Sequence, residues 1–574
     1  MTLLASPLHI IFAATCTIVL CQEYEVVQTA VGKIRGLVET VGKEKVFNFR
    51  GIPFAKPPIG DLRFRKPQPY GPWDYTLDAT KDASPCMQTL NFGGLKFVTN
   101  DEISENCLVL NIHVPGKISN SQNKAVMVWI HGGGFFIGQG SWYNASELAL
   151  KGDVIVVTVN YRLGIFGFLS TFDEASPGNY GLWDQILALQ WVKSNIAAFG
   201  GNPSLMTIFG ESAGGISVSL QTLIPYNKGL FQRAIAQSGV ANTAKLATKS
   251  RAVYDFFAQQ GDCNDISQEN THTWVQCLRQ LPAAKLLNVS MEVMKHHMTK
   301  MDFNMILGPA LDGDLFKADP RDLFSDTYSE EQKFFRSLDY MAGTTDGEGS
   351  LLLMMLPMLA EKYQMNITEG VPTSVICEVY TPKFANVYYN GARGAADALC
   401  SKCKVDNSKE NYLAQQGENL MNLYGDLLFV GPTIKTLKEH EKKNPKAKTY
   451  HYVFTADRDF SEMGIHRPPW YQRSGHGTEL LYLFGSNGLT GVYNLTDSEL
   501  KLTDVMIKYW SNFAKYGDPN GQSLPQWKEY GSEKNYLDLN HQISSGKDLF
   551  SDRISFLQDD MHKLMETTEK HEEL

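Results

Sequence analysis

The chain has 574 residues, of which 43% are hydrophobic, 11% aromatic and 20% charged, and its formal net charge is -9. This composition is typical of a globular protein and excludes a disordered or repetitive chain. The sequence shows no basic patch interleaved with aromatic residues, which argues against a nucleic-acid partner because phosphate binding needs clustered Lys and Arg. No Pro/Gly/Ser-rich linker or charge block interrupts residues 25–560, so we expect one large domain over 22–560.

The first 21 residues form an apolar leader. The run LLASPLHIIFAATCTIVLC occupies residues 3–21, stops at Gln22, and carries small or mid-sized residues at Val19 and Cys21, where a signal peptidase reads them. We therefore predict a signal peptide at 1–21. Because no Lys or Arg precedes the run, a membrane anchor is the alternative, which Pro7 and the short length disfavour.

Cysteine and asparagine patterns indicate an oxidising compartment. Two short loops can be closed by disulfides, Cys86 with Cys107 and Cys263 with Cys277, and each closure would stabilise the fold by roughly 3 kcal/mol. Of the remaining cysteines, Cys377, Cys400 and Cys403, one must stay free or pair elsewhere. Four glycosylation sequons fit the same compartment: Asn144, Asn288, Asn366 and Asn494.

Apolar strands alternate with helices through the middle of the chain. Segments 125–130, 154–161 and 205–209 are rich in β-branched or aromatic residues and show no polar alternation. Strands buried on both faces have this pattern. Segment 180–199 carries apolar residues at helical spacing and stops at Gly200, so it predicts a helix. The order predicts an α/β fold with a large, mostly parallel central sheet flanked by helices.

A glycine-rich segment follows the first of these strands. His131 is followed by three glycines and Phe135, which matches the HGGG loop whose backbone N–H groups bind a developing oxyanion. On its own, a glycine run after a strand is more often an ordinary turn. The glycine run therefore indicates an oxyanion loop only in combination with the serine motif at 207–215.

The stretch TIFGESAGG, residues 207–215, places Ser212 in a G-x-S-x-G pattern between a predicted strand and a predicted helix. Such a serine can simply cap the helix. In the alternative interpretation, a sharp strand-to-helix turn holds the hydroxyl at the carboxyl edge of the sheet as a nucleophile. The two glycine motifs have independent structural requirements and occur in the expected order, which favours the nucleophile.

A serine nucleophile needs a base and an acid that orients the base. The predicted strand 338–343 leads into a loop that contains Glu348, and His476 lies between glycines ahead of an apolar run. The order serine, acid, histidine is the one that the nucleophile-elbow fold uses. Most other histidines have simpler interpretations, such as His451 within the strand-like segment 449–454.

The last residues form a polar tail, 561–574, that stops at HEEL. This tetrapeptide is similar to the KDEL and HDEL retrieval signals, so we expect a retrieval receptor as partner and the endoplasmic-reticulum lumen as location, with secretion as the alternative.

Over nearly the whole mature chain the sequence resembles type-B carboxylesterases of the α/β-hydrolase fold, the family that includes cholinesterases and bile-salt-type lipases. The matching segments are 49–58, 105–112, 129–138, 160–170, 178–189, 197–203, 207–215 and 234–239. The resemblance implies three catalytic residues, Ser212, Glu348 and His476. It also implies oxyanion donors at Gly133, Gly134 and Ala213, and supporting roles for Glu211 and Ser238, although Ser238 could equally be a strand-end cap.

One departure from the family concerns the acid. The family usually has an acidic residue immediately before the glutamate, whereas this chain has Gly347 there and Asp346 one place earlier, so Asp346 is a remote contender. The implied function is a serine carboxylesterase of broad specificity that acts on small-molecule esters through an acyl-enzyme. No cofactor and no metal are expected, because neither a zinc helix nor a dinucleotide site is present in the sequence.

Of three alternatives, the lipase stays open and the other two are disfavoured by the sequence. A lipase differs only in its gorge and lid, which the sequence does not reveal. A choline esterase would carry a tryptophan in the first disulfide loop to hold the quaternary ammonium, and residues 86–107 contain none. A non-catalytic adhesion protein would have a degenerate nucleophile, whereas Ser212 is intact.

Overall fold

The structure is a computed structural model that describes residues 22–89, 91–92, 95–96, 103–119, 121–243, 246, 257, 259–263, 271–299, 307–324, 328–442, 446–458, 467–489 and 493–572. The predicted leader 1–21 lies outside these residues, as do Glu573 and Leu574 at the end of HEEL. Within the described part of the chain, no helix combines the length and the apolar character needed to cross a bilayer.

One large sheet runs through the described part of the chain in the order β1-β2-β3-β7-β9-β8-β10-β11-β12-β13-β14-β15, with β4 paired to β2. Strands from β9 to β14 are mutually parallel, while both ends of the sheet are antiparallel. The strands are β1 (Glu23–Gln28), β2 (Lys33–Val41), β3 (Glu44–Pro53), β4 (Thr76–Asp78), β7 (Val109–Pro115), β8 (Lys124–Ile130), β9 (Ile155–Val159), β10 (Gly201–Glu211), β11 (Arg233–Gln237), β12 (Asp339–Thr345), β13 (Thr449–Phe454), β14 (Asn535–Leu539) and β15 (Ser544–Lys547), with a separate pair β5 (Asn91–Phe92) and β6 (Leu95–Lys96). The mostly parallel central sheet is as predicted.

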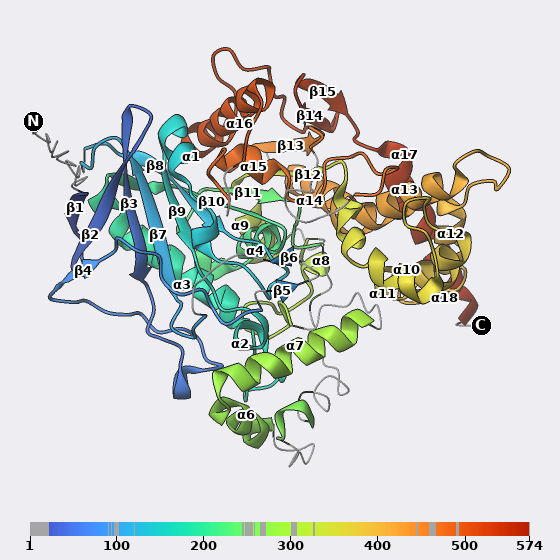
Figure 1. The fold of residues 1–574 in the computed structure, drawn as a ribbon, viewed down its shortest axis with the longest axis horizontal. Coiled ribbons are helices and arrows are strands. Elements are labelled where there is room, and N and C mark those ends of the chain that lie inside the picture. Colours follow the sequence, from blue (N-terminus) through green and yellow to red (C-terminus); the bar gives the residue numbers. More distant parts are fainter. Residues whose placement is uncertain are drawn as a thin grey trace, which may run out of the picture.

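Helices cover both faces of this sheet (Figure 1). They are α1 (Ser146–Gly152), α2 (Gly164–Phe168), α3 (Tyr180–Asn195), α4 (Ala213–Gln221), α6 (Thr271–Gln280), α7 (Ala283–Thr299), α8 (Pro320–Leu323), α9 (Glu330–Phe335), α10 (Leu356–Tyr363), α11 (Thr381–Tyr389), α12 (Ala395–Cys403), α13 (Tyr412–Gly425), α14 (Gly431–Glu441), α15 (Glu479–Phe484), α16 (Asp497–Tyr516), α17 (Ser551–Ser555) and α18 (Met561–Glu572). In Figure 1, α10 to α13 gather with α18 at the right, and α6 and α7 lie below the sheet.

Strand β8 shows why these strands carry no polar alternation. Its residues Val126, Val128 and Ile130 pack into one hydrophobic core with α3 and α4. The intervening Met127 and Trp129 pack into a second core on the other face, with α15 and α16. Burying each such side chain stabilises the fold by roughly 1.5–3 kcal/mol. Both faces of the sheet are therefore covered, as the apolar strands predicted.

Element ends differ from the sequence predictions in three places. The helix predicted at 180–199 ends at Asn195, and residues 196–199 tighten into a 3-10 turn that stops at Gly200, where φ is +88°. Strand β10 begins at Gly201 rather than 205, because Gly201 pairs with Lys124 on β8. Strand β9 ends at Val159, since the backbone N–H of Asn160 turns to the carbonyl of Val109.

Helix α3 is buried around most of its circumference, although its sequence suggested an amphipathic helix. Its buried Asp184 accepts two hydrogen bonds from the Arg162 guanidinium, each 2.7 Å long. A buried polar residue is tolerated where a partner satisfies it, so this helix carries acidic and amide residues inside the protein.

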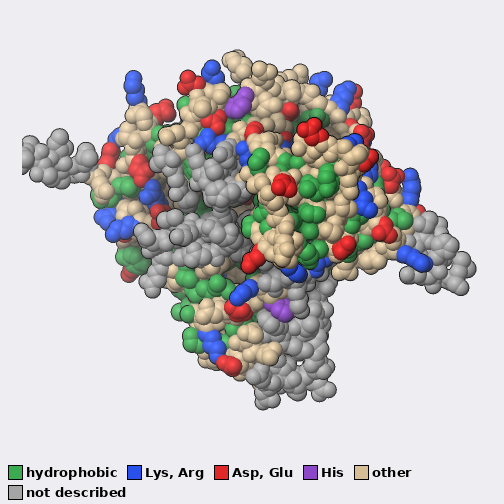
Figure 2. All heavy atoms as spheres, turned by 45° about the vertical axis from the view of Figure 1, so that its right-hand side comes forward, with side chains coloured by type: hydrophobic (Ala, Val, Ile, Leu, Met, Phe, Trp, Pro, Cys, Tyr) green, Lys and Arg blue, Asp and Glu red, His purple; other side chains and the backbone are tan. Residues whose placement is uncertain are grey.

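The helices at the right of Figure 1 form their own core from residues between Leu352 and Met561. A third disulfide, Cys377–Cys400, lies in this region, and Cys403 is a buried free thiol. The pairing that the sequence left open is thereby resolved. Figure 2 shows acidic and basic side chains interspersed over the face that includes these helices.

Candidate active site

Ser212 sits on a strained turn between β10 and α4. Its backbone has φ +57° and ψ −125°, a region that L-residues rarely adopt. The Ser212 N–H donates to the carbonyl of Gln237, and its carbonyl accepts from Ile216. Helix α4 begins directly after it, at Ala213. The turn therefore holds the hydroxyl at the carboxyl edge of the sheet, next to a helix N-terminus.

The two outer glycines of the motif are required by crowding. A Cβ on Gly210 would lie 2.5 Å from the carbonyl oxygen of Ile130, and one on Gly214 would lie 2.0 Å from the same atom. Contacts this short cannot form, so larger residues at either position would push β8 away from the turn.

The HGGG loop lies against this turn. A Cβ on Gly132 would come within 3.1 Å of the Ser212 Cβ. Gly133 and Gly134 have φ of +104° and +63°, and the Gly133 carbonyl accepts from the N–H groups of Phe136 and Ile137. No hydrogen bond from the N–H of Gly133, Gly134 or Ala213 to another described residue is present. These donors are free to bind an oxygen next to Ser212.

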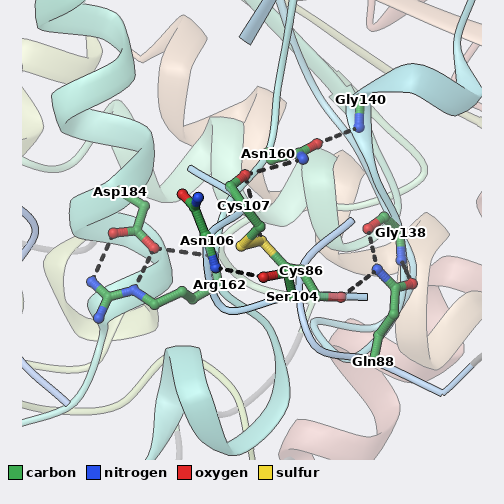
Figure 3. The surroundings of a disulfide bond; sticks show 10 residues. All are labelled: Cys86, Gln88, Ser104, Asn106, Cys107, Gly138, Gly140, Asn160, Arg162 and Asp184. Atoms are coloured by element: carbon green, nitrogen blue, oxygen red, sulfur yellow. Dashed lines mark hydrogen bonds and ion pairs between the residues drawn. A yellow bond between two sulfur atoms is a disulfide. The ribbon is translucent and has the colours of Figure 1, made fainter. Parts of the chain in front are cut away.

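The first disulfide supports the far end of the HGGG loop (Figure 3). Cys86 and Cys107 are bonded, and the side-chain amide of Gln88 both donates to the Gly138 carbonyl, at 2.9 Å, and accepts from its N–H, at 2.8 Å. Asn160 links the Cys107 carbonyl to the N–H of Gly140. The disulfide loop thus fixes the backbone from 138 to 140. The predicted Cys263–Cys277 bridge is also present.

His476 lies on the loop before α15 and faces Glu348. Its Nδ1 is 2.6 Å from Glu348 Oε2, and its backbone N–H donates to Ser350 Oγ at 2.8 Å. The imidazole stacks on Phe429, with ring centroids 4.6 Å apart. These contacts fix the ring so that Nε2 points away from Glu348.

Glu348 is buried three residues after β12, at the start of a 3-10 turn, and each of its carboxylate oxygens has a hydrogen-bond partner. Its Oε1 accepts from Ser238 Oγ at 2.6 Å and from the Thr345 N–H at 2.8 Å. Asp346, the contender from sequence, points elsewhere: it pairs with Arg473 and accepts from the backbone N–H of Ser474. Of the two acids, the structure brings Glu348 to the histidine.

Gly347, the departure from the family pattern, has a local physical reason. Its N–H donates to the Ser474 carbonyl, and a Cβ at this position would lie 2.5 Å from that oxygen. A glycine therefore lets the acid loop approach the histidine loop, where Gly347 and Gly475 form a bridge.

The other nitrogen of His476 faces Glu211. Nε2 is 3.1 Å from Glu211 Oε1, an ion-pair distance, but neither atom has the alignment of a hydrogen bond to a described residue. Among the described residues, the Ser212 hydroxyl has no hydrogen-bond partner either. Hydrogen bonds of catalytic groups are often long or misaligned in unliganded structures, so Nε2 and Oγ remain available to each other when a substrate arrives.

Three buried glutamates surround this single imidazole, and burial raises the pKa of Glu211 and of Glu479 well above the usual range. Burial acts to lower the pKa of His476, but the carboxylates of Glu211 and Glu348 outweigh it and raise the pKa. A positive charge on His476 is therefore stabilised. Among the described residues, no group of three or more His, Cys, Asp and Glu side chains is arranged to hold a metal ion.

Sequence reasoning missed two residues of this site. Glu479 is fully buried, and one of its oxygens accepts a hydrogen bond from the Gln237 side chain. Its position only three residues after His476, at the start of α15, is a signal that the sequence contained. Phe429 comes from a distant helical segment, and no pattern in the sequence connects it to the histidine.

The fold and these loops define an α/β-hydrolase with a serine, a histidine and a glutamate at the carboxyl ends of parallel strands. The sequence profile of the Carboxylesterase family matches residues 23–557, and the chain belongs to this family. Carboxylesterase 1C of Mus musculus is 35% identical over 549 residues, 92% of each chain. Liver carboxylesterase of Sus scrofa is 34% identical and covers 94% of this chain and 93% of its own. A protein of Anas platyrhynchos named fatty acyl-CoA hydrolase precursor, medium chain, is 33% identical, with 96% and 94% covered.

Proposed function

We propose that this protein is a serine carboxylesterase of broad specificity, with Ser212 as nucleophile, His476 as base and Glu348 as the orienting acid. The observation that carries the proposal is the 2.6 Å contact between Glu348 and His476 next to a serine held on a strained turn. The combination is that of a nucleophile, a base and an acid in a hydrolase that acts by acyl transfer.

In the first step, the Ser212 oxygen attacks the ester carbonyl carbon while His476 Nε2 takes the hydroxyl proton. The tetrahedral intermediate collapses, the bond between carbon and alkoxy oxygen breaks, and the alcohol leaves with the proton from His476. In the second step, water gives a proton to His476 and attacks the acyl-enzyme, which releases the carboxylic acid and restores the Ser212 hydroxyl. Glu348 stabilises the imidazolium that forms in both steps.

The N–H groups of Gly133, Gly134 and Ala213 would receive the oxyanion in each intermediate. The position of Gly132 against Ser212, the place of Ala213 directly after it, and the lack of partners for the three N–H groups among the described residues support this role. Removing one donor of this kind from an enzyme typically slows catalysis by about 10² to 10³. Ser238 acts through Glu348, whose carboxylate it holds in place.

A series of p-nitrophenyl esters from acetate to palmitate, together with a medium-chain acyl-CoA thioester, tests the assignment. We expect turnover of short to medium chains, loss of that turnover after an organophosphate labels Ser212, and none in Ser212→Ala. Ser204→Ala changes an exposed serine on the same strand and is the matched control. A preference for the longest chains would instead indicate a lipase. Absence of both turnover and label would overturn the proposal in favour of a binding protein.

We also infer that the protein folds in an oxidising compartment, either the endoplasmic-reticulum lumen or the secretory pathway beyond it. Three disulfides support this inference, because such bridges are rare in reducing compartments. The sequons Asn288, Asn366 and Asn494 are exposed and Asn144 is half-buried, so glycans fit at these positions.

The finer assignment, retention through the HEEL tetrapeptide and its receptor, is tested by deleting residues 571–574 in expressing cells. We expect the full chain to be retained with glycans that endoglycosidase H removes, and the shortened chain to appear in the medium. Equal secretion of both chains would contradict retention, and unglycosylated protein would contradict the lumenal compartment itself.

A further inference from the structure

A cavity of about 490 Å³ lies between α6, the start of α3 and the segment 64–68, and it contains none of the residues of the candidate active site. Figure 1 places α6 below the sheet, near α2 and α7. The volume is in the range of pockets that hold small organic molecules. Its lining combines aromatic walls with charged side chains of both signs.

Arg279, on α6, lines this cavity and is an unusual buried cation. Only 6% of the residue is exposed. Its Nε donates to the carbonyl of Arg63 at 2.9 Å, and its two Nη atoms donate to no other described residue. No carboxylate in the described part of the chain lies within ion-pair distance of it. Among the described residues, the four Nη hydrogens therefore have no acceptor and can bind a molecule in the cavity.

The surrounding fold provides acids for its other buried arginines. Arg63 makes two hydrogen bonds to Glu105, at 2.7 and 2.6 Å, and Arg162 makes two to Asp184. Arg279 differs from these two arginines, because burial and then the charge of Arg65 lower its pKa, and the weaker effects of Tyr180 and Asp61 raise it only in part. An anion in the cavity would offset these effects.

Two of the three acids that line the cavity are already engaged. Asp312 accepts from the side-chain amide of Asn179 and from the backbone N–H groups of Asp314 and Phe316. Asp314 pairs with Lys66 and accepts from Tyr226. The third acid, Glu174, is exposed. Neither Asp312 nor Asp314 pairs with Arg279, which lacks an ion pair among the described residues, although the charges of the whole lining cancel.

Aromatic side chains supply the rest of the wall. Trp183 is half-buried and carries the Lys66 ammonium 3.9 Å above its ring centroid, while Phe64 and Tyr180 are buried behind the cavity. Apolar and aromatic walls with one fixed ion are typical of sites for small amphipathic anions. We propose that this cavity is a second ligand site, which binds an organic carboxylate with its anionic group on Arg279 and its aromatic or apolar body against Trp183.

Calorimetric titration of the full chain with 2-naphthoate tests this site without any measurement of ester hydrolysis, so the proposal and the proposed function can fail separately. We expect 2-naphthoate to bind and its neutral analogue, 2-naphthamide, to bind at least about tenfold more weakly. Arg279→Met should weaken naphthoate by at least about tenfold, and Arg279→Lys by less, because lysine keeps the charge but loses the planar fork. Trp183→Ala should weaken both probes.

Arg35→Met is the matched control, because Arg35 is an exposed arginine on β2 that pairs with Asp78. It should leave naphthoate affinity unchanged. Equal affinity of naphthoate for the wild type and Arg279→Met, equal affinity for naphthoate and naphthamide, or no binding of naphthoate at about 1 mM would each overturn the proposal. Binding of inorganic phosphate without binding of naphthoate would do the same. If Arg279→Met does not fold, the comparison of acid with amide on the wild-type protein still decides the matter.

Discussion

The surroundings of His476 and of Arg279 both bury charge, but they balance it in opposite ways. Three buried glutamates, Glu211, Glu348 and Glu479, surround one imidazole that becomes a cation during the proposed reaction. Arg279, in contrast, has no carboxylate within ion-pair distance among the described residues. Elsewhere in the core Arg162 and Asp184 match each other. A buried ion pair such as Arg162–Asp184 contributes to the fold alone. A buried charged group without a counter-charge indicates a place where a proton or a ligand can bind.

The largest effect is expected from removing the carboxylate of Glu348 next to His476. Glu348→Gln should lower kcat/KM by about 10⁴, because a neutral amide no longer orients the ring or stabilises the imidazolium. Steady-state hydrolysis of p-nitrophenyl butyrate measures it. Asp346→Asn alters the neighbouring acid, which pairs with Arg473 instead, and should cost far less. A larger loss in Asp346→Asn than in Glu348→Gln would reverse the assignment of the acid.

Breaking the buried ion pair between Arg162 and Asp184 should lower the stability of the fold and leave the catalytic machinery in place. Asp184→Asn leaves Arg162 buried without a counter-charge, so we expect the free energy of unfolding to fall by about 3–5 kcal/mol. Urea denaturation followed by fluorescence measures the change. Asp78→Asn breaks the exposed pair with Arg35 and should cost less than about 1 kcal/mol. Similar losses in both variants would show that burial does not distinguish them.

A smaller effect concerns the pH dependence of catalysis. His476 acts as a base only when neutral, so kcat/KM rises with pH through its pKa. Glu211 raises that pKa, and Glu211→Gln should therefore move the rising limb to lower pH, by roughly one unit. Glu479→Gln should move it in the same direction by less. A limb that stays in place, or that moves to higher pH, would contradict the electrostatic role of Glu211.

The smallest effect is expected at the second cavity. Without added anion, Arg279→Met should change the free energy of unfolding by less than about 1 kcal/mol, because it removes a buried cation that has no carboxylate partner among the described residues. The same denaturation experiment compares it with Asp184→Asn. A loss as large as that of Asp184→Asn would mean that Arg279 has a structural role like that of Arg162.

Much of the site follows from local sequence. The turn at Ser212, the HGGG loop and the strands before them each need particular residues within a few positions of one another, so their motifs are visible along the chain. The strands were predicted for the same reason, while their ends were not, because pairing such as Gly201 with Lys124 sets where β10 begins. His476 and Glu348 came from the family resemblance.

The sequence by itself determined the alternation of strands and helices, the nucleophile turn, the oxyanion loop and two short disulfide loops, because these features depend on neighbours in the chain. Tertiary structure alone decided which residues far apart in the chain come into contact. Glu348 reaches His476 over 128 positions and Ser238 reaches Glu348 over 110, Phe429 covers the imidazole, and Cys377 pairs with Cys400 rather than Cys403. The surroundings of Arg279 were also decided by tertiary structure: which described residues pack around a buried side chain has no pattern in the sequence.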